Sequence, residues 1–312
     1  MPRLNIYLFG KFQVYRGDEA VKGLDIRKVQ ELLCYLLLYR THSYPRETLA
    51  GLLWGDTSTA QAKKCMRQTL WQMQSALGVQ NDFDDERLIL VAPDWIQINT
   101  TADLWLDVAE FEKVFDHMKG RRGEELDPHT AQLVRDSVQL YQGDLLEGWY
   151  QDWCIYERER LQKIYLAMLE KLMAYHEAQR EYDVALSYGG QLLRYDHAHE
   201  RTHRRLMSLH YMAGDRAAAL RQYQRCVAAL QEELEAQPSQ RTTALYQRIQ
   251  ADQQEAALSE IARTRAMPLP DASSMHMLFV RLKQHWLTLA NLERQIREDI
   301  DSLEVVLRDF NE

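Results

Sequence analysis

The sequence predicts a mainly α-helical protein that begins with a small β-sheet, and three observations support this fold class. Residues 4–15 are rich in aromatic and β-branched side chains and are followed by turn residues, as short strands are. From Arg27 onward the apolar residues recur at the spacing of amphipathic helices. After Asp107 the chain is almost wholly helical in pattern and resembles itself at a shift of 34 residues.

The first elements expected are a strand pair and two helices. LNIYLFGKFQVY and the following RGDEAV predict a strand, a turn and a second strand. A helix is expected from Arg27 to near Thr41, where the apolar stripe stops. PRETLAGLLW predicts a second helix, with Pro45 at its first position and an end before Gly55.

A third helix is expected over about residues 59–77. Thr57, Ser58 or Thr59 can cap its start, and Gly78 is placed to end it. The residues predicted to face the core are spaced by three or four positions: Ala62, Met66, Leu70, Met73 and Leu77.

Residues 87–98 (RLILVAPDWIQI) contain two β-rich runs around Pro93 and Asp94, which predicts a hairpin. A sheet, three short helices and a terminal hairpin predict a winged helix-turn-helix domain over residues 1–106. In that architecture the third helix enters the DNA major groove, and the hairpin, or wing, contacts the backbone beside it.

A 34-residue repeat organises the chain after residue 107. Residues of the same type coincide at this shift: Leu172 with Leu206, Met173 with Met207, His176 with His210, and Ala185-Leu186 with Ala219-Leu220. Thirty-four residues is the period of tetratricopeptide helix pairs. EYDVAL and DRAAAL then start the second helix of successive repeats, and their small alanines let paired helices approach closely. We therefore expect a tetratricopeptide-like domain over residues 107–258.

The C-terminal residues predict a linker over 259–275 and a long helix over 276–312. The linker includes AMPLPDASSM, which has two prolines and small polar residues. The apolar residues that follow are spaced close to a heptad repeat: Leu282, Trp286, Leu289, Leu292, Ile296, Ile300, Leu303, Leu307 and Phe310. This stripe predicts either a coiled coil that dimerises the protein or a cap on the end of its own repeats.

Length and charge limit the functions that fit. With 312 residues, 46% of them hydrophobic and 27% charged, the chain can bury at least one sizeable core. Its formal net charge of -8 argues against a protein that coats polyanions without selectivity. The first 100 residues carry a net charge of +1 and the other 212 a net charge of -9, so the acidity lies outside the expected winged helix.

The sequence pattern favours a cytoplasmic protein. It shows neither the pattern of a secretory signal nor an apolar run long enough to span a membrane. The four cysteines, Cys34, Cys65, Cys154 and Cys226, form neither a CxxC pair nor a disulfide framework, which fits a reducing compartment.

One motif suggests an enzyme. HERTH, at residues 199–203, has the H-E-x-x-H spacing of zinc metalloproteases. A catalytic zinc also needs a third protein ligand and an open position, whereas Arg201, Arg204 and Arg205 nearby would repel a dication. Because the motif falls inside a repeat helix, we interpret its histidines as packing and surface residues and expect no metal.

Several motifs point to a known family. They are RKVQELLCYLLL, PRETLAGLLWGD, MRQTLWQMQSALG and DVAEF in the first part, and LYQGDLLEG, DWCIYERERL, GDRAAALRQYQRC and EELEAQPS in the second, together with Asp196, Glu200, His203, Arg204, Leu206 and Met207. Through them residues 27–111 resemble the OmpR-type winged helix, and residues 130–250 resemble the bacterial transcriptional activator domain. The combination is typical of antibiotic-regulatory activators of actinomycetes, and the likeness covers most of residues 4–250.

The resemblance implies a transcriptional activator that binds repeated promoter DNA and recruits RNA polymerase, with no cofactor. The residues opposite the apolar stripe of the third helix are the candidate contacts: Lys63, Lys64, Arg67, Gln68, Trp71 and Gln74. Arg67 and Gln68 suit base edges, because arginine pairs with guanine and glutamine with adenine. Lys63 and Lys64 suit phosphates or bases, and Arg46 and Arg87 suit the DNA backbone.

The sequence departs from the family at Gln74, where the family pattern has an arginine, and at Trp71, an exposed position. Fewer cations predict a shallower salt dependence, and a homodimer could compensate by joining two half-sites. The rival interpretation is a tetratricopeptide adaptor whose winged helix docks protein instead of DNA. An enzyme is the weakest class, since no phosphate-binding loop, nucleophile elbow or supported carboxylate pair is found. No motif indicates a small-molecule effector.

Overall fold

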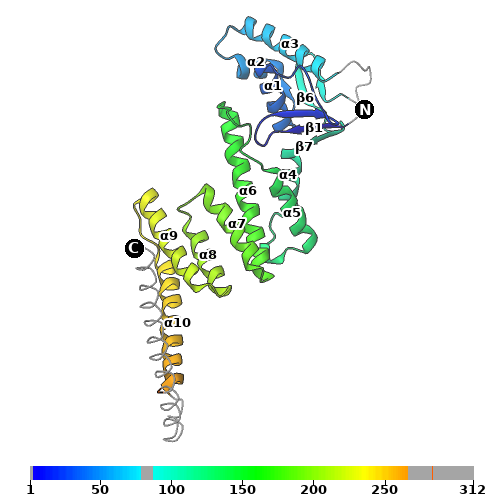
Figure 1. Cartoon of the computed structure of the whole chain (residues 1–312). Coiled ribbons are helices and arrows are strands. Elements are labelled where there is room, and N and C mark those ends of the chain that lie inside the picture. The colour runs from blue at the N-terminus through cyan, green and yellow to red at the C-terminus, as the bar shows by residue number, and fades with distance from the viewer. Residues whose placement is uncertain (1–2, 79–86, 266–282, 284–312) are drawn as a thin grey trace, which may run out of the picture. The chain divides into compact units, whose positions relative to one another are not determined.

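The computed structural model describes residues 3–78 and 87–265, together with Lys283 (Figure 1). It forms two compact units, Met1–Ile249 and Gln250–Glu312. The described chain is mainly helical with small N-terminal sheets, which confirms the predicted fold class.

A four-stranded sheet opens the chain. Its strands are β1 (Leu4–Tyr7), β2 (Gln13–Arg16), β3 (Glu19–Ala20) and β7 (Leu104–Leu106), in the order β3-β2-β1-β7. The sequence predicted fewer strands, because the turn at Gly10, which has a φ of 79°, divides the stretch that reads as one run. It also missed β7, which is only three residues long and pairs parallel to β1 across a hundred positions.

Three helices and a wing follow, as predicted. The helices are α1 (Arg27–Leu38), α2 (Arg46–Trp54) and α3 (Thr59–Ala76). The strands β4 (Tyr44–Pro45), β5 (Ile89–Val91) and β6 (Trp95–Ile98) form a second sheet in the order β4-β6-β5. Pro45 belongs to β4 and is the N-cap of α2, so this helix starts one residue later than expected.

The rest of the described chain is helical. After α4 (Asp107–His117) come a 3₁₀ turn, η2 (Gly123–Glu125), and α5 (Pro128–Leu140). The repeats comprise α6 (Asp152–Ala178), α7 (Tyr182–Tyr195), α8 (Glu200–Met212) and α9 (Arg216–Leu234), followed by α10 (Gln240–Arg265). α10 makes residues 259–265 helical where a linker was expected to begin. The rest of that linker and, apart from Lys283, the expected C-terminal helix lie outside the described residues.

The 34-residue period is visible in the turns between paired helices. The Glu181 amide donates to the carbonyl of His176 over 2.9 Å, and the Asp215 amide donates to the carbonyl of His210 over the same distance. Ala185 and Ala219, at equivalent places in α7 and α9, are both fully buried. Each repeat therefore closes the same turn and uses the same small residue for close helix packing.

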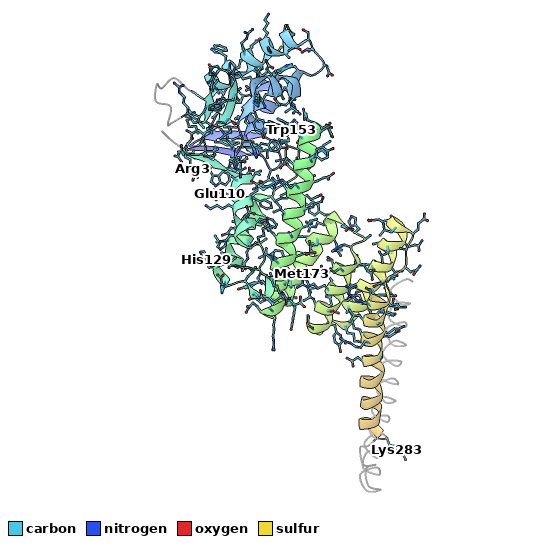
Figure 2. All side chains as sticks on the ribbon, turned by 180° about the vertical axis from the view of Figure 1, so that it is seen from behind. Arg3, Glu110, His129, Trp153, Met173 and Lys283 are labelled. Carbon is cyan, nitrogen blue, oxygen red and sulfur yellow. The ribbon has the colours of Figure 1, made fainter. Side chains whose placement is uncertain are left out.

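The winged helix and the repeat region share one hydrophobic core. Buried residues of α1 and α6 belong to a single continuous cluster. Tyr35 of α1 contacts Trp153 edge-on at 5.6 Å between ring centroids, at the end of α6 labelled in Figure 2. The Arg27 guanidinium lies 3.8 Å above the ring of Trp149, in the segment before α6.

A buried carboxylate reinforces this junction. Asp107, the first residue of α4, is 1% exposed. Its Oδ2 accepts the amides of Leu8 and Phe9 at 2.7 and 2.9 Å, and its Oδ1 accepts the amide of Val108 at 2.7 Å. Burial penalises the charged form and raises the pKa of Asp107 to about 6, although the three amides oppose the shift. The N-terminal strand is thus tied to the start of the helical region.

Candidate nucleic-acid interface

The central element of the candidate interface is α3. Ser58 is its N-cap, with a hydroxyl that accepts the Gln61 amide at 3.4 Å, and the chain leaves the helix through Gly78 at a φ of 70°. The predicted stripe is buried: Ala62, Met66, Leu70, Met73 and Leu77 are all at most 5% exposed. Sequence periodicity therefore predicted correctly which face of α3 packs against the domain.

The opposite face of α3 carries the predicted contact residues. Lys63, Lys64, Arg67 and Gln68 are exposed. Trp71, one turn further along, is 68% exposed, whereas Gln74 is half-buried. The structure thus gathers five of the six predicted α3 residues on an accessible surface.

The start of α2 and the turn of the wing border the same surface. The Arg46 amide donates to the carbonyl of Asp94 in the wing turn over 2.9 Å. Arg46, Lys63, Arg67 and Asp94 help to line a pocket of about 430 Å³ between these elements. Within the described chain the buried Nε of Arg46 has no hydrogen-bond partner, so no hydrogen bond at this atom fixes the guanidinium.

Arg87 occupies a different position from Arg46. It is half-buried and precedes β5, whereas the wing turn lies beyond the other end of that strand. At about 3.3 Å per residue the three-residue strand separates Arg87 from the turn by roughly 10 Å. The two arginines predicted to contact the DNA backbone therefore lie at opposite ends of the hairpin.

An acidic residue that sequence reasoning missed lies within this surface. Glu47, in the first turn of α2, forms an ion pair with Lys63, with 2.5 Å between Glu47 Oε1 and Lys63 Nζ. The hydrogen bond from Lys63 lowers the pKa of the Glu47 carboxyl. Sixteen positions separate the two residues, so no rule of local helix spacing could have revealed the pair.

Three of the predicted contact residues on α3 are not engaged. Across the described residues, Lys64, Arg67 and Gln68 make no side-chain hydrogen bond or ion pair. A free guanidinium can donate two hydrogen bonds to guanine O6 and N7, and a free amide can bond adenine N6 and N7. The side chains of Lys64, Arg67 and Gln68 are therefore available to bind a ligand.

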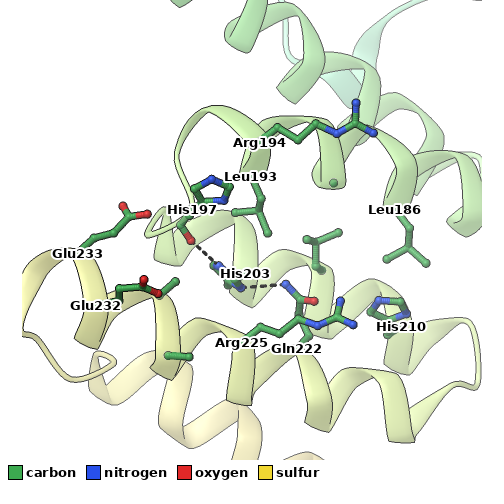
Figure 3. Close-up of a pocket in the computed structure, with 14 residues that line it drawn as sticks. Leu186, Leu193, Arg194, His197, His203, His210, Gln222, Arg225, Glu232 and Glu233 are labelled. Carbon is green, nitrogen blue, oxygen red and sulfur yellow. Dashed lines mark hydrogen bonds between the residues drawn. The ribbon is translucent and has the colours of Figure 1, made fainter.

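The zinc-like motif has the opposite arrangement. His203 is 3% exposed, and Figure 3 shows it between His197 and Gln222. Its Nε2 donates to the His197 carbonyl and its Nδ1 accepts from Gln222 Nε2, both over 2.8 Å. Because the two bonds use both ring nitrogens, they fix a neutral tautomer, and desolvation lowers the pKa of His203.

The other two residues of the motif are also engaged. Glu200 accepts the Ser239 amide at 2.9 Å and hydrogen bonds from the hydroxyls of Ser239 and Thr242. His199 is the N-cap of α8 instead of lying within the helix, and its Nδ1 contacts the Thr202 hydroxyl at 2.7 Å. The two histidines and the glutamate of the motif therefore all make contacts within the repeat region.

Comparison with known proteins agrees with this architecture. Residues 106–250 match the family described as the bacterial transcriptional activator domain. This match confirms the resemblance that the sequence motifs predicted for the repeat region, and it supports the class of transcriptional regulators. None of the curated proteins matches the sequence.

The structure is similar to that of Mycobacterium tuberculosis EmbR, solved in complex with a low affinity phosphopeptide. The TM-score is 0.57 at 18% sequence identity, and the match covers 88% of this chain and 73% of EmbR. At this identity the likeness describes the fold. In the described residues, no helix combines the length and apolar character that a membrane span requires.

Proposed function

We propose that this regulator binds double-stranded promoter DNA and reads its sequence with α3. The observation that carries the proposal is the exposed, unengaged set of Lys64, Arg67 and Gln68 on one face of that helix. Arg67 and Gln68 read bases, Lys63 and Lys64 bind phosphates or base edges, and Arg46 contacts the backbone beside the wing turn.

The remaining roles follow from the family. In the cytoplasm the protein activates transcription by contacting RNA polymerase, and its helical repeats supply protein contacts or self-association. A homodimer on two half-sites would add the affinity that a face with few cations lacks.

Selection of duplexes from a random DNA pool by the full-length protein tests the DNA proposal. The selection is run at two salt concentrations and repeated with the Arg67→Ala, Gln68→Ala variant. Enrichment of a direct or inverted repeat, lost in this variant, is the expected result, and half-site spacing then gives the dimer geometry. Gln240→Ala, Arg241→Ala is a matched control, because it removes an exposed Gln-Arg pair at the start of α10.

A second candidate function is protein docking by the winged helix, and Trp71 favours it. A tryptophan that is 68% exposed is typical of the anchors that dominate protein interfaces. A docking module would show neither sequence-selective nor strongly salt-dependent DNA binding. Failure of folded protein to enrich any duplex would therefore favour docking over DNA reading.

A further inference from the structure

A groove in the repeat region has chemistry that the DNA interface does not use. It is lined by residues of α7, α8 and α9 and encloses about 840 Å³ (Figure 3). Its apolar lining comes from Leu186, Leu193, Leu206, Ala228 and Ala229. This volume lies within the range of ligand pockets, which is about 300–1,000 Å³.

Two arginines face each other across this groove. Arg194 comes from α7 and Arg225 from α9, and Figure 3 shows them on opposite sides. Both are exposed, and neither makes an ion pair or hydrogen bond within the described chain. Burial lowers the pKa of His210, which also lines the groove; Asp215 opposes this shift, and the charges of Arg225 and Arg221 add to it.

The groove is acidic at its other end. Glu232 and Glu233 line it there, opposite His210 in the view of Figure 3. Seven residues separate Arg225 from Glu232 along α9, which is about 10 Å of helix. The wall formed by α9 thus changes from positive to negative over a distance that three or four extended residues, or two helical turns, would cover.

We infer that this groove docks an extended or helical segment of a protein partner with apolar side chains and a carboxylate that reaches Arg194 and Arg225. The inference rests on the proposed role of the repeats in protein contacts and adds the chemistry of the partner. Charge complementarity selects this occupant, because the unpaired guanidinium groups favour a carboxylate and the leucines favour apolar side chains. The acidic end sets the direction of the segment, with a basic or neutral residue beside Glu232.

A selection with random 12-residue peptides displayed on phage tests the inference on the full-length protein. Enriched peptides should combine apolar residues with Asp or Glu. Binding of the best synthetic peptide, followed by fluorescence anisotropy, should weaken at least tenfold in Arg194→Glu, Arg225→Glu and should fall with added salt. The control Arg201→Glu, Arg241→Glu changes two exposed arginines outside the groove and should alter affinity less than twofold.

Two further variants, one of the protein and one of the peptide, test whether charge pairing causes the loss of binding. Arg194→Gln, Arg225→Gln removes the charge with less perturbation, and it replaces the charge-reversed protein if that protein fails to fold. Changing the acidic residue of the peptide to Lys should restore binding to the charge-reversed variant. Enrichment of no peptide, or equal affinity for wild type and variant, would overturn the inference. The arginine variants leave α3 intact. If the groove binds no peptide but the protein still selects a DNA sequence, only the groove inference fails and the DNA proposal stands.

Discussion

The polar clusters on α3 and α8 each contain side chains with the chemistry of a functional site, and their surroundings in the structure differ. Lys64, Arg67 and Gln68 lie on an exposed face and have no side-chain partner in the described chain. Glu200 and His203 have their polar atoms engaged by other parts of the same domain. A side chain whose hydrogen bonds are satisfied internally stabilises the fold, whereas an exposed and unengaged one is available to a ligand.

The largest expected effect that sharpens this comparison is the stability loss in His203→Ala. The change leaves the His197 carbonyl and the Gln222 amide without a buried partner, so the free energy of unfolding should fall by about 2–3 kcal/mol. Arg67→Ala should change it by less than about 0.5 kcal/mol, as exposed substitutions usually do. Urea unfolding followed by circular dichroism measures both, and equal losses would erase the distinction.

DNA affinity should show the reverse ranking. Arg67→Ala removes a potential bidentate contact with guanine worth about 1–3 kcal/mol, so affinity for the selected duplex should fall on the order of 10- to 100-fold. His203→Ala, assayed at a temperature where it is folded, should bind like the wild type. Anisotropy titrations with selected and scrambled duplexes measure both. If Arg67→Ala lowers affinity for the scrambled duplex as much as for the selected duplex, Arg67 contacts phosphate and not a base.

The buried histidine should also make stability depend on pH. Burial lowers the pKa of His203 in the folded state, whereas the unfolded value is about 6.5. Below that pH the unfolded chain binds a proton that the folded chain does not, so stability is present above pH 6.5 and is lost as the pH falls. His210 contributes with the same sign.

Unfolding in urea at pH 7.5 and 5.5 measures this effect. The stability lost between the two values should be smaller in His203→Gln than in the wild type, by about 1 kcal/mol. An unchanged or larger pH dependence would contradict a neutral, internally bonded His203.

Glu47→Gln should move α3 further toward an open DNA-binding surface. It frees Lys63 from its ion pair and removes one negative charge from the interface. We expect DNA affinity to rise a few-fold, and the slope of log K against log salt to steepen by about one phosphate contact. Asp18→Asn, another exposed acid outside this pocket, is the control. Unchanged affinity would mean that Lys63 does not reach the DNA.

The smallest effect is expected at His199. His199 is the N-cap residue of α8, but its side chain bonds no backbone amide there and contacts the Thr202 hydroxyl. His199→Ala should therefore cost less than about 1 kcal/mol and leave DNA binding unchanged. Metal analysis of wild type and variant should give the same zinc content. Loss of one zinc per chain in the variant would restore the enzymatic interpretation of HERTH.

The sequence was sufficient for elements whose signals are local. Ser58 and Gly78 delimit α3, the stripe from Ala62 to Leu77 identifies its buried face, and the 34-residue period aligns α7 with α9. These signals work because caps, helical periodicity and repeats act within a few turns or recur along the chain.

Features that depend on distant pairing were not predictable. Two partners of Asp107, Leu8 and Phe9, lie about a hundred positions away, and β7 is recognisable only beside β1. The Lys63–Glu47 pair and the repeat groove likewise require helices to be brought together first. Base reading by α3 is a property of a complex with DNA and stays a prediction.

The shared core between α1 and α6 has a consequence for promoter architecture. The contact between Tyr35 and Trp153 and the buried Asp107 join α3, the proposed DNA-reading helix, and the repeat groove within one compact unit instead of through a flexible tether. A partner held in the groove would therefore face one side of the duplex. Moving the operator by a full helical turn, about 10.5 base pairs, would keep the partner on the same side of the duplex. Moving it by half a turn would place the partner on the opposite side.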